Sequence, residues 1–160
     1  MNWAAGDGTL AAGRVVIFAL SVALQDLTPR TCRYQALKTV SGIGVTLALT
    51  IALETGEISR FESPGNFASY ARTVDSRRES NGKKKGEGNT KCGNKHLAWA
   101  FIEAAHFAVR YDATIKRWYQ KKCANGLSVV AIKAVAHKLA RACFYVMKNG
   151  EPFDVSRAFG

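Results

Sequence analysis

Apolar residues recur at helical spacing over most of the chain. The apolar run at 12–26 predicts a first helix that "DLTPR" ends, and residues 31–40 predict a second, shorter helix. "VTLALTIALETG" predicts a third helix, which Gly56 closes. The next helix is expected to begin at Pro64, with Ser63 as its N-cap. The first half of the chain is therefore expected to be helical.

The second half continues this pattern. Three periodic stretches, "KHLAWAFIEAAHFAVRY", "ATIKRWYQKKC" and "SVVAIKAVAHKLARACFYVMKNG", predict helices, the last capped by Ser128 and closed at Gly150. Only residues 72–95 lack any period. The predicted fold class is all-α, a helix-hairpin-helix plus a helical bundle interrupted by one basic loop rich in glycine and lysine. The aromatic residues of these helices are expected in the core: Trp99, Phe101, Phe107, Trp118 and Tyr119.

The stretch "LKTVSGIGVTLALTI" has the pattern of a helix-hairpin-helix. Gly42 and Gly44 permit a tight turn, so that amides at the start of the second helix face outward. A DNA phosphate can bind there without reference to base identity. Ile43 is expected to point inward between the two helices. The alternative is an ordinary αα-hairpin that uses glycines for its turn.

The charge of the chain points to a polyanionic partner. The net charge is +11 and the pI is about 9.8, which favours nucleic acid or an anionic membrane surface. Residues 72–95 hold eight basic and three acidic residues together with several glycines, which favours nucleic-acid contact over a merely solvated charge run. The expected DNA-contacting side chains are Arg77, Arg78, Lys83, Lys84, Lys85, Lys91 and Lys95.

Ser80 is a candidate nucleophile in this basic loop. A serine hydroxyl is a poor nucleophile unless a base or a metal activates it, and no base is evident nearby along the chain. From composition alone, an ordinary loop serine is the better interpretation. No metal site is expected either, because the single E-x-x-H of Glu103 and His106 lacks the second pair that metal-binding bundles use.

Two long stretches closely resemble a known family. "LKTVSGIGVTLALTIALETGEISRFESPGNFASYARTVDSRRESNGKKKGEGNTKCGNKHLAWAFIEAA" and "AIKAVAHKLARACFYVMKNGEPFD" are similar to the C-terminal domain of bacterial insertion-sequence transposases related to the Piv DNA invertase, a family of serine-dependent, RNA-guided bridge recombinases. The resemblance covers residues 37–154. Its motifs are the G-I-G turn, R-F-x-S-x-x-x-F-A-S-Y, S-x-G-K, T-K-x-G-N, and A-x-K-L-x-R followed by E-P-F-D.

The resemblance implies a division of labour. In that family an RNase H-like domain binds divalent metal, Mg²⁺, through four acidic residues, and the C-terminal domain supplies a serine that forms a covalent phosphoserine link to DNA. Several members find their sites through an RNA made by the element. Ser80 occupies the place of that serine. Asn81 stands where glycine is commoner, and Arg72, Thr73 and Asp75 replace the usual Gly-Leu-x-Pro, which indicates a sub-branch.

The resemblance also predicts the organisation of the chain. We expect a connecting helix at 1–36, the serine-bearing domain at 37–154 and a tail at 155–160, in a truncated, cytoplasmic bacterial protein that lacks the acidic domain. Such a chain would bind DNA, have no cofactor of its own and be inactive alone. A guide RNA, a second copy and a full-length transposase are further candidate partners, and a membrane is not. The alternative is a non-catalytic helix-hairpin-helix module that binds nucleic acid.

Overall fold

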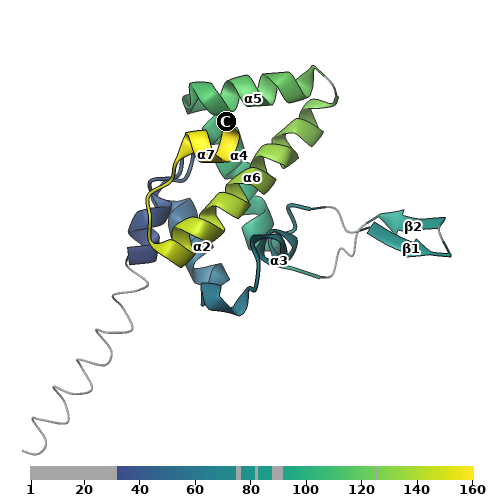
Figure 1. Ribbon diagram of the computed structural model, residues 1–160, viewed down its shortest axis with the longest axis horizontal. Coiled ribbons are helices and arrows are strands. Elements are labelled where there is room, and N and C mark those ends of the chain that lie inside the picture. The colour runs from purple at the N-terminus through teal and green to yellow at the C-terminus, as the bar shows by residue number, and fades with distance from the viewer. Residues whose placement is uncertain (1–31, 75–76, 82, 88–91, 125) are drawn as a thin grey trace, which may run out of the picture. The chain divides into compact units, whose positions relative to one another are not determined.

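A computed structural model describes residues 32–74, 77–81, 83–87, 92–124 and 126–160 (Figure 1). The predicted helix at 12–26 lies outside these residues. A helical stretch at 32–37 is followed by helices α2 (Val45–Thr55), α3 (Pro64–Tyr70), α4 (Lys95–Tyr111), α5 (Ala113–Cys123), α6 (Ser128–Asn149) and α7 (Val155–Phe159), with a 3-10 turn, η1, at Ile58–Arg60. The predicted all-α fold is confirmed.

Side-chain caps fix where most of these helices begin. Ser63 accepts a hydrogen bond from the Asn66 amide at 3.2 Å, as predicted, and Asn94, Asp112 and Asp154 cap α4, α5 and α7 in the same way. Each of these oxygens satisfies an amide that the first turn of a helix leaves without a partner. The ends of α2 and α6 are also as predicted, because Gly56 and Gly150 follow them with positive φ.

The predicted cap of α6 is wrong. Ser128 is the first residue of α6 itself, and Leu127 occupies the N-cap position with no side-chain hydrogen bond. Serine is preferred at the N-cap only statistically, and here the helix begins one residue earlier than expected, so Ser128 falls inside its first turn.

The core lies between α4, α6 and the shorter helices around them. The Phe67 ring of α3 packs edge-on against Phe101 of α4 at 6.0 Å and lies 6.3 Å from Phe144 of α6. Four of the six buried residues of α4 are alanines, which let neighbouring helices approach closely. The buried residues of α4 form one stripe at helical spacing: Leu97, Ala100, Phe101, Ala104, Ala105 and Ala108.

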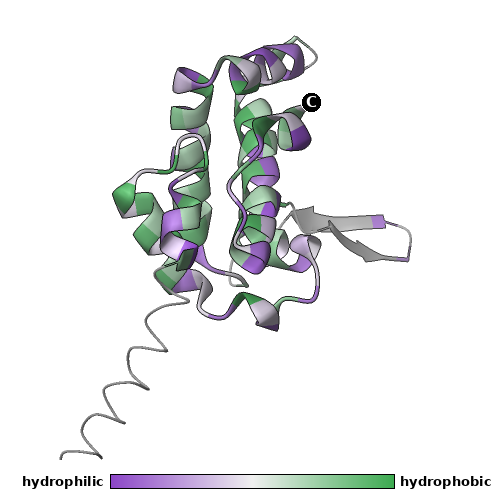
Figure 2. Cartoon of the chain, turned by 60° about the vertical axis from the view of Figure 1, so that its left-hand side comes forward, coloured by the Kyte–Doolittle hydropathy of each residue, from purple (hydrophilic) through white to green (hydrophobic). Residues whose placement is uncertain are grey.

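Two of the aromatic residues expected in the core lie at the surface instead. Trp99 is 51% exposed and Phe107 is 41% exposed, whereas Phe101 is fully buried and Trp118 and Tyr119 are half-buried. Neither belongs to the buried stripe of α4: Trp99 lies on the opposite face, and Phe107 lies about 80° around the helix from Trp99, at the edge of the stripe. Hydrophobic and hydrophilic positions along the helices are coloured in Figure 2.

The C-terminal segment packs onto the helices. The Phe159 ring is buried and lies edge-on to Trp118 of α5 at 5.6 Å, and Lys138 Nζ of α6 donates a hydrogen bond to the Ala158 carbonyl at 2.7 Å. Helix α7 is thereby held against α5 and α6. Among the described residues, no helix combines the length and apolar character needed to cross a bilayer.

Candidate nucleic-acid interface

The glycine turn before α2 is packed tightly onto α4. Gly42 has φ +86°, and a Cβ there would overlap the Ala104 carbonyl oxygen and lie 2.6 Å from the Ala108 amide nitrogen. Only glycine fits this backbone and this approach. Gly44, by contrast, is the N-cap of α2, and a Cβ there would meet nothing within 4 Å. Gly42 therefore shapes the turn, and Gly44 leaves the start of α2 open.

The N-terminus of α2 differs from those of α3, α4, α5 and α7 because no side chain caps it. Its first backbone bond within the helix runs from the Ala48 amide to the Gly44 carbonyl at 2.9 Å, so the amides between them have no acceptor inside the helix. Residues 44–46 are exposed, and a groove of about 570 Å³ beside them is also lined by Lys38 and Tyr111. This end of α2 carries the partial positive charge of a helix N-terminus.

Hydrogen bonds to the Asp112 carboxylate hold the turn in place. Ser41 Oγ donates to Asp112 Oδ2 at 2.8 Å, while Asp112 Oδ1 accepts from the amides of Thr114 and Ile115 at the start of α5. One carboxylate thus ties the glycine turn to the corner between α4 and α5. Ile43 is buried in the core, as the hairpin motif predicts.

The basic segment contains a β-hairpin that its lack of period did not predict. Strands β1 (Arg77–Ser80) and β2 (Lys83–Glu87) pair antiparallel, with Ser80 opposite Lys83 and Glu79 opposite Lys84. Asn81, between the strands, has φ +52°. The dipeptide Asn-Gly between two short segments is a strong signal for a two-residue hairpin turn, so the hairpin could have been predicted from residues 81 and 82. The candidate nucleophile therefore ends a strand directly before a tight turn.

The two ends of the basic segment are held together beside α3. The Asn94 amide donates to the Tyr70 carbonyl at 2.7 Å, and both the amide and the hydroxyl of Thr73 donate to the Ala68 carbonyl. Gly93 has φ +84°, and a Cβ there would lie 2.7 Å from the Tyr70 carbonyl oxygen. We call this arrangement, formed by Ala68, Tyr70, Thr73, Gly93 and Asn94, the anchor.

Asn94 is the centre of the anchor. Its Oδ1 accepts from the amides of His96 and Leu97 at 2.8 and 3.1 Å, which caps α4, and its Nδ2 donates to Glu54 Oε2 of α2 at 2.6 Å. Hydrogen bonding from Asn94, and then from Arg60, lowers the pKa of the Tyr70 hydroxyl. In the sequence, Gly93 and Asn94 stood out only as part of the T-K-x-G-N motif. Their contacts in the anchor give a physical reason for these two positions of the motif.

The predicted DNA-contacting residues that the structure describes fall into three groups. Gly42 and Gly44 form the turn before α2, and Lys95 is the exposed first residue of α4. Lys91 lies outside the described residues. The others are in the two strands: Arg77, Arg78, Lys83, Lys84 and Lys85. Of these, Lys83 is exposed.

Two positions that depart from the resembled family share an unusual backbone. Arg72 and Asn81 are the only described residues other than glycine with positive φ, at +56° and +52°. Both stand where the resemblance expects glycine. The left-handed region costs a residue with a Cβ about 1–2 kcal/mol and costs asparagine less. The glycines of the family pattern thus match conformational demands that this chain meets at some cost.

Metal-binding groups do not gather in the described part of the chain. No three His, Cys, Asp or Glu side chains there are close enough to hold an ion. Glu103 and His106 lie on α4, and His106 is exposed.

Comparison with known proteins identifies the family. Residues 34–120 match the transposase family IS116/IS110/IS902. The candidate transposase y4qE of Sinorhizobium fredii (strain NBRC 101917 / NGR234) is 30% identical over 109 residues, which cover 66% of this chain and 28% of that protein. The match thus spans less than a third of the relative's length. The family match covers more than half of the chain, which therefore belongs to the IS116/IS110/IS902 family of transposases.

Proposed function

We propose that this chain is the DNA-binding, serine-bearing part of its transposase, with Ser80 as the nucleophile. The observation that carries the proposal is the position of Ser80 at the end of β1, paired with Lys83 across a tight turn. This backbone pairing puts residue 80 directly before the turn that joins the two strands. The basic residues of both strands follow the same backbone within a few residues of the hydroxyl.

The proposed reaction is a transesterification. Ser80 Oγ attacks the scissile phosphorus and forms an Oγ–P bond, and the bond from phosphorus to one deoxyribose oxygen breaks. That oxygen leaves with the electron pair and takes up a proton, while the serine proton passes to a base. Arg77, Arg78 and Lys83 would stabilise the negative charge that builds up on the phosphoryl oxygens. The phosphoserine ester retains the energy of the broken phosphodiester bond. A second hydroxyl can therefore later displace the serine.

The base for this step is not expected within the described residues. The family resemblance assigns activation to an acidic domain with bound divalent metal, and no comparable group of carboxylates gathers in the described part of the chain. We therefore propose that the chain alone binds nucleic acid without cleaving it. Cleavage or joining of element ends by the purified chain would contradict this.

The turn before α2 is proposed to hold a phosphate of the same DNA. Gly44 leaves the first amides of α2 exposed, and Lys38 lines the groove beside them. Amides at a helix N-terminus bind phosphate without reading the base. In this proposal Gly42 contributes by allowing the turn to lie against α4.

The test is to replace Ser80 by alanine in a complete transposase that carries this domain. The covalent adduct between protein and DNA, measured by denaturing electrophoresis with labelled element ends, is expected to disappear, while binding stays within about twofold because one hydroxyl contributes little to backbone affinity. Ser69→Ala, at an exposed position of α3, is the matched control and should leave the adduct intact. An adduct that survives Ser80→Ala would refute the assignment.

The alternative, a non-catalytic helix-hairpin-helix module, is favoured by the open N-terminus of α2. It predicts that the complete protein binds element ends but forms no covalent adduct with DNA, even when Ser80 and Ser69 are both unchanged. Adding the element's own RNA to the binding assay separates a guide-dependent transposase from a protein that needs DNA alone.

A further inference from the structure

Most of the positive charge of the chain lies outside the basic segment. Residues 113–150 contain eight lysines and arginines and no aspartate or glutamate, whereas residues 72–95 contain eight basic and three acidic residues. Helices α5 and α6 therefore account for +8 of the net charge of +11, against +5 for the basic segment, and the rest of the chain contributes −2. The basic residues of α5 and α6 are interspersed with apolar residues. They therefore form no long basic run that would stand out in the sequence.

The fold brings several of these cations together around one ring. Lys122 Nζ of α5 and Lys138 Nζ of α6 lie 5.4 and 5.0 Å from the centroid of the Trp118 ring. Burial lowers the pKa of Lys138, and the charges of Lys122 and Arg141 lower it further. Like charges from two helices thus stand close enough to repel one another.

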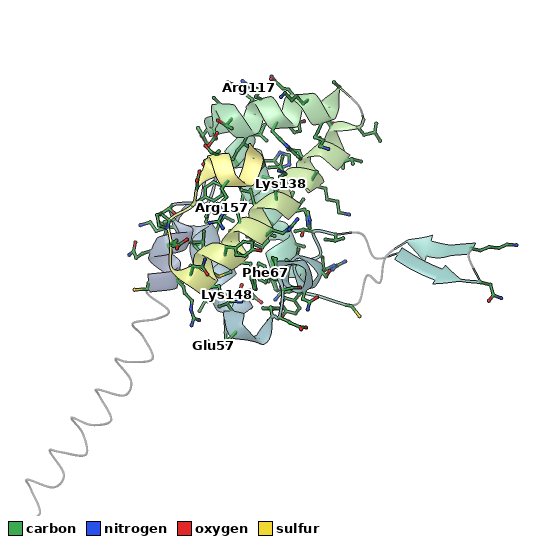
Figure 3. All side chains as sticks on the ribbon, viewed as in Figure 1. Glu57, Phe67, Arg117, Lys138, Lys148 and Arg157 are labelled. Carbon is green, nitrogen blue, oxygen red and sulfur yellow. The ribbon has the colours of Figure 1, made fainter. Side chains whose placement is uncertain are left out.

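A cavity extends this cluster to α7. It has a volume of about 410 Å³ and is lined by Lys138, Arg141 and Arg157, with Tyr145 and Phe153 among its other walls. The acidic residues Glu151 and Asp154 also line it. The described structure nevertheless shows no ion pair to Arg141 or Arg157. Figure 3 labels Lys138 and Arg157 where α6 meets α7.

One of the two carboxylates is already engaged. Asp154 Oδ1 accepts hydrogen bonds from the amides of Ser156 and Arg157, at 2.8 and 3.4 Å, and so serves as the cap of α7. The cations therefore keep donors available for an external anion. Guanidinium groups suit phosphate because their paired N–H groups match two of its oxygens.

We propose that Lys122, Lys138, Arg141 and Arg157 form a second track for the phosphate backbone of a nucleic acid, separate from the basic segment and the glycine turn. We call this set the α5–α7 track. The proposal rests on the proposed function, since it gives the same nucleic acid a second contact. An anion along the track relieves the repulsion among its cations. The half-exposed Tyr145 ring at the cavity can stack against a base or sugar.

A nucleic acid fits this surface better than a membrane does. Insertion into a lipid surface needs apolar side chains beside the cations. Apart from Tyr145, the exposed large apolar residues of this part of the chain are Leu127, Val129 and Val130 at the start of α6, whereas the cavity involves residues 138–146 of that helix. An α-helix rises about 1.5 Å per residue, so these apolar residues are at least about 12 Å from the cavity-lining part of α6.

The test measures binding of the full chain by fluorescence anisotropy across a salt series. The probes are a duplex DNA of about 30 base pairs, its single strand, and the RNA of the same sequence. In Arg141→Gln/Arg157→Gln the slope of log affinity against log salt should become less steep by about 2, and affinity at moderate salt should fall about 10- to 100-fold. Lys138 is kept, because it also holds α7 through Ala158.

A matched control removes the same charge elsewhere. Arg110→Gln/Lys116→Gln changes two exposed residues near the α4–α5 corner, and Lys116 lies about 240° around α5 from Lys122. This variant should lower affinity less than about threefold. An equal loss in both variants would show an effect of net charge alone and would overturn the track. If the double track variant does not fold, Arg157→Gln alone should reduce the slope by about 1.

Two further outcomes separate the track from the proposed function. If Lys83→Gln/Lys84→Gln/Lys85→Gln reduces the slope and Arg141→Gln/Arg157→Gln does not, the track is wrong while the proposed function stands. If the unchanged chain binds none of the three probes, the proposed function fails and the track fails with it. Binding to anionic vesicles that nucleic acid does not displace would likewise overturn the track. A drop with one probe only identifies which nucleic acid the track holds.

Discussion

The basic segment at 72–95 and the α5–α6 helices carry similar numbers of cations in different physical settings. In the segment, charge is dense along a short hairpin whose strands pair with each other, and the connection to the helices is the anchor. In α5 and α6, charge is spread along helices whose other faces are buried in the core. Figure 2 shows α5 coloured mostly as hydrophilic, with hydrophobic positions on α6 below it.

The two regions differ in what holds their cations in position. Cations on α5 and α6 are placed by apolar packing, so their arrangement should survive without a ligand. The strands of the segment gain their order from each other, from the turn and from the anchor. We therefore expect the helical pair to resist changes of charge and to be sensitive to changes of the core, and the segment to show the opposite pattern.

The largest expected effect is on the core beneath the helical pair. Phe144→Ala should lower the free energy of unfolding by about 3–5 kcal/mol, because Phe144 of α6 is almost fully buried and packs against Phe67 of α3. Replacing residues 77–87 by a short Gly-Ser linker should change it by less than about 1 kcal/mol, since loop length alone costs little. Urea denaturation measures both. A larger loss from the linker than from Phe144→Ala would reverse the comparison.

The next effect concerns the anchor. Gly93→Ala should lower the free energy of unfolding by about 2–3 kcal/mol, because the new Cβ would press on the Tyr70 carbonyl and the backbone has positive φ. The matched change in the other region is Gly126→Ala between α5 and α6, where a Cβ meets nothing within 4 Å and φ is not positive. Gly126→Ala is expected to stay within about 0.5 kcal/mol. Equal effects of the two changes would contradict the anchor.

Asn94→Ala should cost about 1–2 kcal/mol, since it removes the cap of α4 and leaves Glu54 without its hydrogen bond. Asn66→Ala, at an exposed position of α3, is the control and should be nearly neutral. The same variant should raise the pKa of Tyr70 toward its usual value, because hydrogen bonding from Asn94 is the main cause of the lowering. Ultraviolet titration of the phenol checks this second result.

A smaller effect of pH is expected in the helical pair alone. Burial, and then the charge of Arg141, lower the pKa of His137 below its usual value of 6.5. The unfolded chain then binds more protons in this range, so stability is complete above about pH 6.5 and falls as pH drops through the folded pKa. Urea titrations at about pH 5 and pH 7.5 should show this loss, and His137→Gln should reduce it. A pH dependence unchanged by His137→Gln would contradict the assignment.

The smallest effect is at the turn of the hairpin. Asn81→Gly should stabilise the strand pair by a few tenths of a kcal/mol, because glycine takes positive φ without strain and asparagine does so at little cost. Hydrogen exchange of the strand amides is the suitable measurement, since global unfolding will scarcely change. Slower exchange in the variant agrees with the strained turn, and faster exchange contradicts it.

The helices could be predicted because apolar period and end signals agree. Gly56, Gly150, Ser63 and Pro64 each mark a boundary that the structure has in the same place. These signals are local, so they need no knowledge of what packs where. The buried stripe of α4 follows from the same period.

Features that depend on neighbouring elements could not be predicted in this way. The surface positions of Trp99 and Phe107 follow from which face of α4 meets α6, and the residues of the proposed α5–α7 track come together only because α5, α6 and α7 converge. The role of Gly42 likewise depends on the approach of α4. The roles proposed for Ser80 and the strand cations stay predictions.

The most direct test of the account is the salt dependence of nucleic-acid binding by the unchanged full chain. If both basic regions hold the phosphate backbone, at least about five contacts form, and log affinity should fall with log salt with a slope of about −4 or steeper for duplex DNA. Binding that is absent at low salt, or a slope near zero, would contradict the central claim that this chain holds nucleic acid by its phosphates.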